Sequence, residues 1–439
     1  MNLKKLLPQS TKNKLHKLQS QLARIRYGNP SKKLTVVGVT GTKGKTSVCN
    51  LISSILDAAK IPNAMETTIN TKIGDKTIYH TEKNLWVTTP PAHVLQKFFR
   101  EIKNRGITHV VLEVTSSAID QYRTHGIDFD VLVYTNLSHD HLDYHKTMEN
   151  YLNAKLKVFK QNPEAKFVIN RDDQHWNLFY NLKAKEKFLF SINKSVDHGA
   201  VARKILLSPD SSTFTAAAEN GQVAINSHLP GIFNISNQLA AFCTGVALGI
   251  DPEIIKKGLE NVSGIRGRME QIVVSPKQDF TVIVDYAHNA DSLKNVYETV
   301  KQGMQNRGGR LIAVLGATGR RDTTKRPIMG ALAGNYADLI IVTDEDPYDE
   351  DPMSIIEVVA AGVLKGGRKN QWRLNRNYWK VLDRKQAIRK AIAEAEKGDV
   401  VVITGKGAEE VMAVGEHKFV PFSDRKIARE ELEARFLKK

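Results

Sequence analysis

Short apolar runs alternate with segments of helical periodicity along most of the chain. β-Branched runs at residues 34–37, 109–112 and 131–134 predict buried parallel strands, because both faces of such strands are apolar. Between them, apolar side chains recur every three or four residues, as at 48–60 and 93–105, which predicts helices packed on a sheet. The alternation returns at 281–284, 311–315, 339–342 and 400–403. It predicts two successive α/β units of the doubly wound type.

Two segments depart from this alternation. Residues 67–85 predict a hairpin or loop around Gly74-Asp75, and residues 185–230 predict a small accessory sheet with frequent turns. Residues 264–270, Gly-Ile-Arg-Gly-Arg-Met-Glu, predict a hinge. We therefore expect a basic helical segment at 1–33, a central domain at 34–267 and a C-terminal domain at 268–439.

Composition narrows the class of protein. With 439 residues, 41% of them hydrophobic, the chain can form two or three globular domains. No apolar run approaches the ~20 residues of a membrane span, and the N-terminus lacks the apolar core of a signal peptide. Cys49 and Cys243 are too few for a disulfide framework and lack metal-ligand spacing. We expect a cytoplasmic location.

The chain carries 64 Lys and Arg against 47 Asp and Glu, a net charge of +17, which predicts an anionic partner. The sequence shows no nucleic-acid recognition module, so nucleic acid is a weakly supported partner. ATP and a phosphorylated sugar nucleotide are also anionic, and the net charge does not distinguish between them. Residues 1–33 hold nine of the basic residues and no acidic one, and Leu15, Leu18, Leu22 and Ile25 add a thin apolar stripe. A solvated basic helix packed on the next domain is the favoured interpretation. A membrane-surface or substrate-phosphate contact is the alternative.

Residues 38–47, Gly-Val-Thr-Gly-Thr-Lys-Gly-Lys-Thr-Ser, lie between a predicted strand and a predicted helix. This is the context of a phosphate-binding loop, in which glycines let backbone N–H groups converge on phosphate oxygens. Lys45 is expected to reach the outer phosphates and Thr46 to hold Mg²⁺. An ordinary glycine turn is the alternative, and the flanking elements argue against it. The predicted ATP contacts are Gly41, Thr42, Lys43, Gly44, Lys45, Thr46 and Ser47.

Three further candidates, Glu113, His141 and Lys155, follow predicted strand ends or lie on the next helix. Open α/β sheets bind ligands at the carboxyl ends of their strands, which favours a ligand contact for Glu113. A lysine is an unusual neighbour for magnesium, since its ammonium group repels a cation. Taken singly, Lys155 would be an exposed helix lysine and His141 a structural histidine.

The phosphate loop resembles the ATP-binding loop of the Mur ligase family, whose members join an amino acid to a carboxylate with ATP. Residues 113–116, 121–123, 136–138 and 140–145 also resemble motifs of this family. The similarity is greatest to the UDP-N-acetylmuramoyl-tripeptide synthetases (MurE), and it covers residues 34–439. It implies that CO₂ carbamylates Lys155, which then binds Mg²⁺ (two sites) with Thr46, Glu113 and His141. Since carbamylation needs a neutral amine, we expect burial or nearby cations to lower the pKa of Lys155. Ser117 stands where these enzymes usually have histidine.

The resemblance also assigns the remaining site residues. The implied catalytic set is Lys45, Lys155, Glu113, His141 and Arg268. Further ATP contacts are implied for Asn237 near the adenine, Arg268 on the phosphates, Asp285 on the ribose, and His288. Substrate contacts are implied for Thr88, Thr89, Ser116, Arg123, Arg326, Glu345, Asp346, Tyr348, Gly405 and Glu409. Each of these residues also has a simpler interpretation. Arg268 could be a surface arginine, Asp285 a turn aspartate, and the nearby Asn234 the N-cap of a helix.

The sequence also bears on which amino acid is added. Diaminopimelate-adding MurE enzymes carry Asp-Asn-Pro-Arg, whose arginine holds the distal carboxylate, whereas this chain has Glu345-Asp346-Pro347-Tyr348. A tyrosine cannot supply a bidentate cationic contact. Ala408 replaces a usual histidine, and Glu409 is kept. A pocket with Glu345, Asp346 and Glu409 and without that arginine clamp favours L-lysine or a similar diamino acid.

The expected fold is α/β: a central P-loop ATPase-like parallel-sheet domain with a small accessory sheet, followed by a Rossmann-like C-terminal domain. The expected activity is ADP-forming amide ligation through an acyl phosphate, in peptidoglycan precursor synthesis. We expect a monomer that acts on small molecules and not on nucleic acid. Mur ligases that bind UDP-sugars use a separate N-terminal domain, and residues 1–33 are too short to form it, so the acceptor stays open. A folylpolyglutamate or cyanophycin-type ligase, or a nucleotide-dependent binding protein without ligase activity, are the alternatives.

Overall fold

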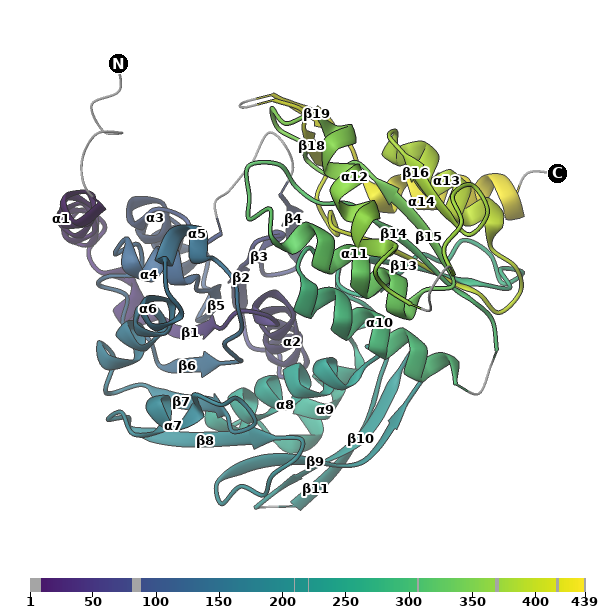
Figure 1. Ribbon diagram of the computed structural model, residues 1–439. Helices are drawn as coiled ribbons and strands as arrows, with labels where there is room; N and C mark the ends of the chain where they lie inside the picture. Colours follow the sequence, from purple (N-terminus) through teal and green to yellow (C-terminus); the bar gives the residue numbers. More distant parts are fainter. Residues whose placement is uncertain are drawn as a thin grey trace.

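The computed structural model describes residues 9–80, 88–208, 210–219, 221–305, 308–367, 371–415 and 418–437. They form two lobes, each built on its own sheet, with the N-terminal half of the chain in one lobe and the C-terminal part in the other (Figure 1). This is the α/β architecture expected from the sequence. Within the described residues, no helix has the length and apolar character needed to cross a membrane.

The first lobe contains an eleven-stranded sheet in the order β11-β10-β9-β8-β7-β6-β1-β5-β2-β3-β4. The seven central strands, from β9 to β2 in this order, pair in parallel. The outer strands β10 and β11 on one side and β3 and β4 on the other pair antiparallel. Their bounds are β1 Thr35–Thr40, β2 Asn63–Glu66, β3 Asn70–Ile73, β4 Lys76–Tyr79, β5 His109–Glu113, β6 Val131–Tyr134, β7 Lys166–Asn170, β8 Glu186–Ser191, β9 Gly199–Leu207, β10 Ser212–Ala218 and β11 Gly221–Ser227.

Two of the less regular predictions have clear outcomes. The hairpin expected around Gly74-Asp75 forms from β3 and β4, although residues 81–85 of that segment lie outside the described part. The strands expected over 185–230 also form, but they extend the main sheet instead of making a separate one. Gly199 explains this continuity: a Cβ at this position would lie 1.8 Å from the Leu189 carbonyl oxygen. Only glycine therefore lets β9 start against β8.

Helices cover both faces of the first sheet. Alternate residues of β1 face opposite ways, so Val37 and Val39 pack in one apolar cluster and Val36 in another. The first cluster is completed by α2 Lys45–Ala58, α8 Ile232–Ala247 and α9 Pro252–Glu260, and the second by α3 Ala92–Asn104 and α6 Met148–Lys160. Shorter elements on the lobe are η2 Pro30–Lys33, α4 Ser116–Asp120, α5 Leu142–His145 and α7 Trp176–Tyr180, and α1 Gln9–Tyr27 lies outside α3.

The second lobe has a six-stranded sheet in the order β12-β13-β17-β14-β15-β16, parallel except for β12. The strands are β12 Glu270–Gln271, β13 Thr281–Asp285, β14 Leu311–Leu315, β15 Leu339–Thr343, β16 Tyr378–Val381 and β17 Val400–Thr404, with a separate hairpin of β18 Val411–Ala413 and β19 Phe419–Pro421. The helices are α10 Ala290–Met304, α11 Lys325–Tyr336, α12 Pro352–Val363, α13 Arg384–Glu394 and α14 Asp424–Phe436. The first three pack on one face of the sheet and the last two on the other.

Candidate active site

The turn between β1 and α2 has the shape of a phosphate cradle. Gly41 and Gly44 have φ of 155° and 83°, and a Cβ on either would collide with a neighbouring side chain. Asn136, after β6, supports the turn, because its side chain accepts from the Lys43 N–H (2.9 Å) and its carbonyl from the Thr42 N–H (2.9 Å). Asn136 belongs to a motif seen in the sequence but was not predicted as a site residue. Thr46 and Ser47 are buried in the first turn of α2, where the helix N-terminus favours an anion.

Two lysine amines meet at this turn. Lys45 Nζ donates to the carbonyls of Gly41 (3.1 Å) and Thr42 (2.8 Å), and Lys155 Nζ from α6 donates to the same Gly41 carbonyl at 2.7 Å. Lys155 is only 1% exposed. Burial and then the charge of Lys45 lower the pKa of Lys155 well below its ordinary value. The expectation of a depressed pKa at this lysine thus has a physical basis in its surroundings.

Glu113 lies at the end of β5 beside the phosphate turn. Its Oε2 accepts from the Thr46 hydroxyl at 2.9 Å and from the Thr68 N–H at 3.0 Å. The carboxylate is 2% exposed. The pairing joins a side chain at the start of α2 with one at the neighbouring strand end, and the sequence assigns both residues to Mg²⁺. Thr68, in the turn between β2 and β3, was missed, because a backbone donor leaves no side-chain signal.

His141 and Lys155 share Tyr151 as a neighbour. The Tyr151 ring centroid lies 4.4 Å from Lys155 Nζ and 6.0 Å from the His141 ring centroid. His141 is exposed and takes a left-handed backbone conformation with φ of 54°. Tyr151 itself bonds Thr42 Oγ1 at 3.1 Å, which connects it to the phosphate turn. Lys155 and Tyr151 therefore lie at the phosphate turn, with His141 beyond the Tyr151 ring, and Tyr151 is an addition from the structure.

Four of the residues predicted as substrate contacts lie near Glu113. Thr89 Oγ1 donates to the Glu113 carbonyl at 2.6 Å, and the Thr89 carbonyl accepts from Arg123 Nη1 at 3.0 Å. Thr88 Oγ1 donates to Thr68 Oγ1 at 2.9 Å, and Ser116 Oγ lies 2.9 Å from a ring nitrogen of the buried His145. These polar groups lie between the end of β5 and α4, and Thr89 and Ser116 are buried there.

The nucleotide residues of the second lobe follow β13. Asp285 is buried, and its two oxygens accept from the N–H groups of Met269 and Ala287, both at 2.7 Å. Burial raises the pKa of Asp285, against the charge of Arg268. Arg268 lies over the Tyr286 ring at 4.5 Å. The carboxylate thus holds a turn, as the simpler interpretation proposed, and each oxygen keeps a second lone pair for a ligand.

Two further candidates for nucleotide binding are Asn237, on α8, and His288, in the second lobe. A Cβ at Gly44 would lie 2.2 Å from Asn237 Oδ1, so Asn237 touches the phosphate turn. Asn234 is not the N-cap: α8 begins after Gly231, and Asn234 lies in its first turn with its amide donating to the Pro230 carbonyl at 2.8 Å. Burial, then Lys325, lowers the pKa of His288 to about 4, so its ring is neutral near pH 7.

Contacts between the lobes surround these residues. Asn289 Nδ2 donates to Asp140 Oδ2 at 3.5 Å, and Lys43 Nζ lies 4.0 Å from Asp291 Oδ2. Although burial opposes it, the charges of His141 and His288 lower the pKa of Asp140. The carboxyl ends of both sheets therefore face one another across the phosphate turn, the position where α/β sheets bind ligands.

The predicted amino-acid pocket contains a cation that sequence reasoning left out. Lys406 Nζ is 2.7 Å from both oxygens of Asp346 and 2.6 Å from Glu409 Oε2, and it is 1% exposed. Against the effect of burial, Glu409 and Asp346 raise the pKa of Lys406 to about 12. Two of the three acidic residues are thus paired. The single positive charge of Lys406 balances one of these two carboxylates. Glu345 is the third acidic residue, and burial raises its pKa to about 7.

Glu345 and Arg326 each keep a free polar atom. Among the described residues, Glu345 Oε2 and Arg326 Nε are buried without a hydrogen-bond partner. Gly405, with φ of 112°, makes room for the carboxylate, since a Cβ there would lie 2.1 Å from Glu345 Oε2. The other side of Arg326 is used: Nη2 donates to Glu350 Oε2 at 2.7 Å. Tyr348 follows β15 with φ of 54° and contacts the chain near β18 through its N–H.

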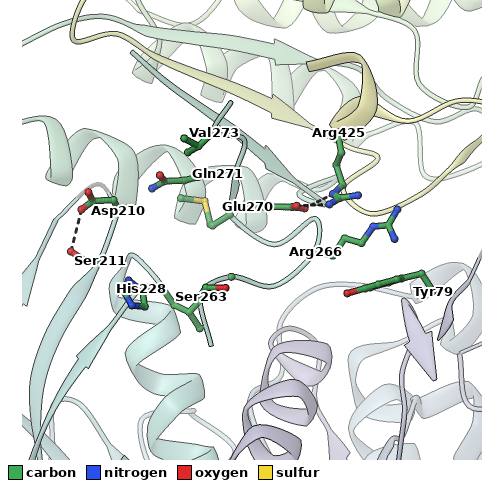
Figure 2. A pocket seen from close by; sticks show the side chains of 13 residues that line it. Tyr79, Asp210, Ser211, His228, Ser263, Arg266, Glu270, Gln271, Val273 and Arg425 are labelled. Atoms are coloured by element: carbon green, nitrogen blue, oxygen red, sulfur yellow. Dashed lines mark hydrogen bonds and ion pairs between the residues drawn. The ribbon is translucent and has the colours of Figure 1, made fainter. Parts of the chain in front are cut away.

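A separate cleft of about 680 Å³ lies at the hinge between the lobes (Figure 2). Arg266 forms an ion pair with Glu410 of the second lobe and lies 4.3 Å from the ring centroid of Tyr79 on β4. Arg425 of α14 donates to Glu270 at 2.6 Å, as Figure 2 shows. Residues 264–270, predicted as a hinge, therefore hold contacts to both lobes.

Comparison with known proteins agrees with this geometry. A family model described as the Mur ligase middle domain matches residues 39–245, and one described as the glutamate ligase domain of Mur ligases matches 267–407. A UDP-N-acetylmuramoyl-L-alanyl-D-glutamate--2,6-diaminopimelate ligase of Clostridium tetani is 38% identical over 407 residues, which cover 93% of this chain and 79% of the relative. This chain belongs to the Mur ligase family. It is an ATP-dependent ligase of the acid–amino-acid class.

Other relatives support the same assignment. The enzyme of the same name from Geobacillus thermodenitrificans is 38% identical over 421 residues, covering 94% of this Mur ligase and 82% of the relative. A solved structure of a 2,6-diaminopimelate ligase of this type has a TM-score of 0.66 at 29% identity, over 97% of this chain and 83% of that one. The folylpolyglutamate synthase of Mycobacterium tuberculosis has a TM-score of 0.71 at 17% identity, over 96% and 95% of the two chains, and shares the fold.

Mur ligases depend on ATP and Mg²⁺, and the residues around the phosphate turn of this Mur ligase fit both. Thr46 Oγ1 and Glu113 Oε2 offer two oxygen donors 2.9 Å apart, and Mg²⁺ usually takes one or two protein oxygens together with phosphate and water. In the part of the chain that the structure describes, no three His, Cys, Asp or Glu side chains group closely enough to hold a metal. Phosphate oxygens and water are the ligands that complete a magnesium site of this kind.

Proposed function

We propose that this Mur ligase joins an amino acid to the carboxylate of a UDP-muramoyl dipeptide and converts ATP to ADP, in peptidoglycan precursor synthesis. The observation that carries the proposal is the meeting of Lys45 and Lys155 at the Gly41 carbonyl, beside the Thr46–Glu113 pair. A cationic group for phosphate, a buried amine whose pKa is lowered and paired oxygen donors at one strand edge suit phosphoryl transfer to a carboxylate.

In the reaction we propose, the acceptor carboxylate attacks the γ-phosphorus of ATP, which gives an acyl phosphate and ADP. The amine then attacks the acyl carbon, loses a proton, and displaces phosphate. Lys45 and Arg268 stabilise the negative charge on the transferred group. When bound, Mg²⁺ neutralises phosphate charge, and we assign Thr46, Glu113, His141 and a carbamylated Lys155 to hold it. The contacts of Lys43 and Asp140 with the second lobe bring the two lobes together beside the reacting groups.

The acceptor assignment rests on the surface beside Glu113. Thr88 donates to Thr68, Thr89 donates to the Glu113 carbonyl, and Arg123 donates to the Thr89 carbonyl. Ser116 adds a hydroxyl that is paired with His145. Such donors match the carboxylate and amide groups of a short peptide. The sequence relatives, named for ligation to UDP-N-acetylmuramoyl-L-alanyl-D-glutamate, support a UDP-muramoyl dipeptide over other carboxylates.

The amino acid is assigned to the pocket between β15 and β17. The free Glu345 Oε2 can accept from an ammonium group, and the free Arg326 Nε can donate to a carboxylate. With Lys406 balancing one of its two partners, the pocket keeps a net negative charge when Glu345 is ionised. Tyr348 offers no cationic fork for a second carboxylate. We therefore assign L-lysine or a similar diamino acid as the nucleophile, and the 2,6-diaminopimelate named for the relatives is the competing candidate.

The deciding experiment measures phosphate release from ATP by the purified enzyme with UDP-N-acetylmuramoyl-L-alanyl-D-glutamate and a panel of amino acids. We expect release that requires both acceptor and amine, with L-lysine preferred, and a product whose mass equals the two substrates less water. Release without an amine would contradict ligation. A preference for diaminopimelate would overturn the assignment of lysine while leaving the ligase reaction intact.

A further inference from the structure

Helix α1 packs against the first lobe with the polar side of its surface. Asn13 donates to Asp120 Oδ2 at 3.0 Å, Ser20 donates to the Tyr122 carbonyl at 2.5 Å, and Ala23 is buried against the same region. These residues recur at a spacing of seven and three, which places them along one side of the helix. Small and polar side chains thus form the inner face of α1.

The large aliphatic side chains of α1 lie on the opposite side. Leu15, Leu18, Leu22 and Ile25 are 46%, 53%, 57% and 77% exposed, and their spacing of three, four and three gives one continuous stripe. With 100° per residue, the stripe lies about half a turn from Ser20 and Ala23. A helix that stabilises a lobe normally turns such a stripe inward, so this stripe is placed for contact with something outside the lobe.

Charge selects the kind of partner. Lys14 and Arg26 are exposed at the two sides of the stripe, Lys17 is exposed farther round, and α1 has no acidic residue. A second copy of this chain would bring these cations onto one another if the stripes paired. A surface with apolar depth and negative charge fits both features, as when basic amphipathic helices lie in the headgroup layer of anionic lipids.

The position of α1 allows such contact during catalysis. Figure 1 shows α1 at the outer edge of the first lobe, beyond α3 and on the side away from the second lobe. The active site faces the second lobe, so a surface bound to α1 does not interfere with the contacts between the two lobes. We infer that the α1 stripe, Leu15, Leu18, Leu22 and Ile25 with Lys14 and Arg26, docks this ligase on an anionic lipid surface.

Vesicle binding by the full chain tests the inference. The probes are vesicles of equal parts phosphatidylglycerol and phosphatidylcholine, and vesicles of phosphatidylcholine alone. We expect the protein to sediment with the anionic vesicles and to be released by salt. The variant Leu18→Gln/Leu22→Gln should bind at least about tenfold more weakly, because two leucines no longer enter the apolar layer. Lys14→Gln/Arg26→Gln should weaken binding and reduce its salt dependence.

A matched control replaces two exposed leucines away from α1, Leu206→Gln/Leu374→Gln, which are 70% and 47% exposed in the parent chain. This variant should bind like the parent, and all variants should keep the parent's amine-dependent phosphate release without vesicles. Failure of the parent to bind anionic vesicles at low salt would overturn the inference. Equal binding by stripe and control variants, or equal binding to phosphatidylcholine, would overturn it as well. Self-association that the stripe variant abolishes, without vesicle binding, would assign the stripe to a second copy instead.

Discussion

Lys45 and Lys155 donate to the same oxygen atom, the Gly41 carbonyl, at 3.1 Å and 2.7 Å. Two ammonium groups at one carbonyl repel each other, and the site is buried, so charge on Lys155 is disfavoured. A neutral lysine amine is a nucleophile toward CO₂, whereas an ammonium is not. The packing of α6 against the phosphate turn therefore favours the neutral amine, which is the form that the proposed carbamylation requires.

Lys155→Met should lower amine-dependent phosphate release by roughly a hundredfold or more, because the side chain keeps its length but loses its nitrogen. Lys160→Met, at the exposed end of the same helix, should change release little. The measurement is steady-state phosphate release, repeated on parent enzyme in buffer stripped of CO₂ and then supplied with bicarbonate. Parent turnover that ignores bicarbonate, with intact-protein mass showing no CO₂ adduct, would refute the carbamate.

In CO₂-free buffer, Lys155 should also leave a signature in stability. The pKa of Lys155 is lower in the folded chain than in the unfolded chain, so between those two values the unfolded state binds more protons. The free energy of unfolding should therefore rise as pH rises toward 10.5 in the parent and not in Lys155→Met. Urea titrations at several alkaline pH values give the comparison. Parallel slopes for the two proteins would show that Lys155 is charged in the fold.

Thr46→Val should reduce phosphate release by about a hundredfold, because it removes the hydroxyl that bonds Glu113 while keeping the side-chain shape. Thr46→Ser keeps a hydroxyl and should retain most activity. The apparent Mg²⁺ requirement of each variant, measured by titration at saturating ATP, should rise for valine only. An unchanged requirement in Thr46→Val would place Mg²⁺ elsewhere.

Glu345→Gln should flatten the pH dependence of stability between pH 4.5 and 7. The pKa of Glu345 rises from 4.5 unfolded to about 7 folded, so the folded state holds the proton over this window. Stability of the parent should fall as pH rises through it, by about 3 kcal/mol at full effect, and the amide variant should lack this loss. Glu66 has a similar shift and contributes equally to both proteins. Denaturant melts across the window provide the test, and identical slopes would contradict it.

Lys406→Met should destabilise the second lobe by about 3 kcal/mol, since it leaves Asp346 and Glu409 without their shared cation. Adding Asp346→Asn and Glu409→Gln should recover most of the loss. The matched control is Lys380→Met, which breaks a more exposed pair with Glu357 at 2.7 Å and should cost under about 1 kcal/mol. Thermal and urea unfolding measure the differences. Equal losses in Lys406→Met and Lys380→Met would mean that the buried cluster is not a coupled unit.

The sequence determined the order of strands and helices, the phosphate turn and the lobes' α/β class, because these follow from local periodicity and from glycines needed at fixed positions. It also indicated Thr46, Glu113 and Lys155, since strand ends and helix starts of parallel units meet at one edge. It predicted a basic helical segment within residues 1–33 with an apolar stripe but did not say which side faces the lobe.

Only the tertiary structure decided contacts between residues distant in the chain. The sharing of the Gly41 carbonyl, the support from Asn136 and Thr68, and the pairing of Lys406 with Asp346 and Glu409 all depend on how elements pack. How elements pack also decides that β9 to β11 continue the main sheet and that the apolar stripe of α1 faces outward. Side-chain patterns fix local conformation over a few residues, whereas burial and pairing are set by neighbours that the sequence lists a hundred positions away.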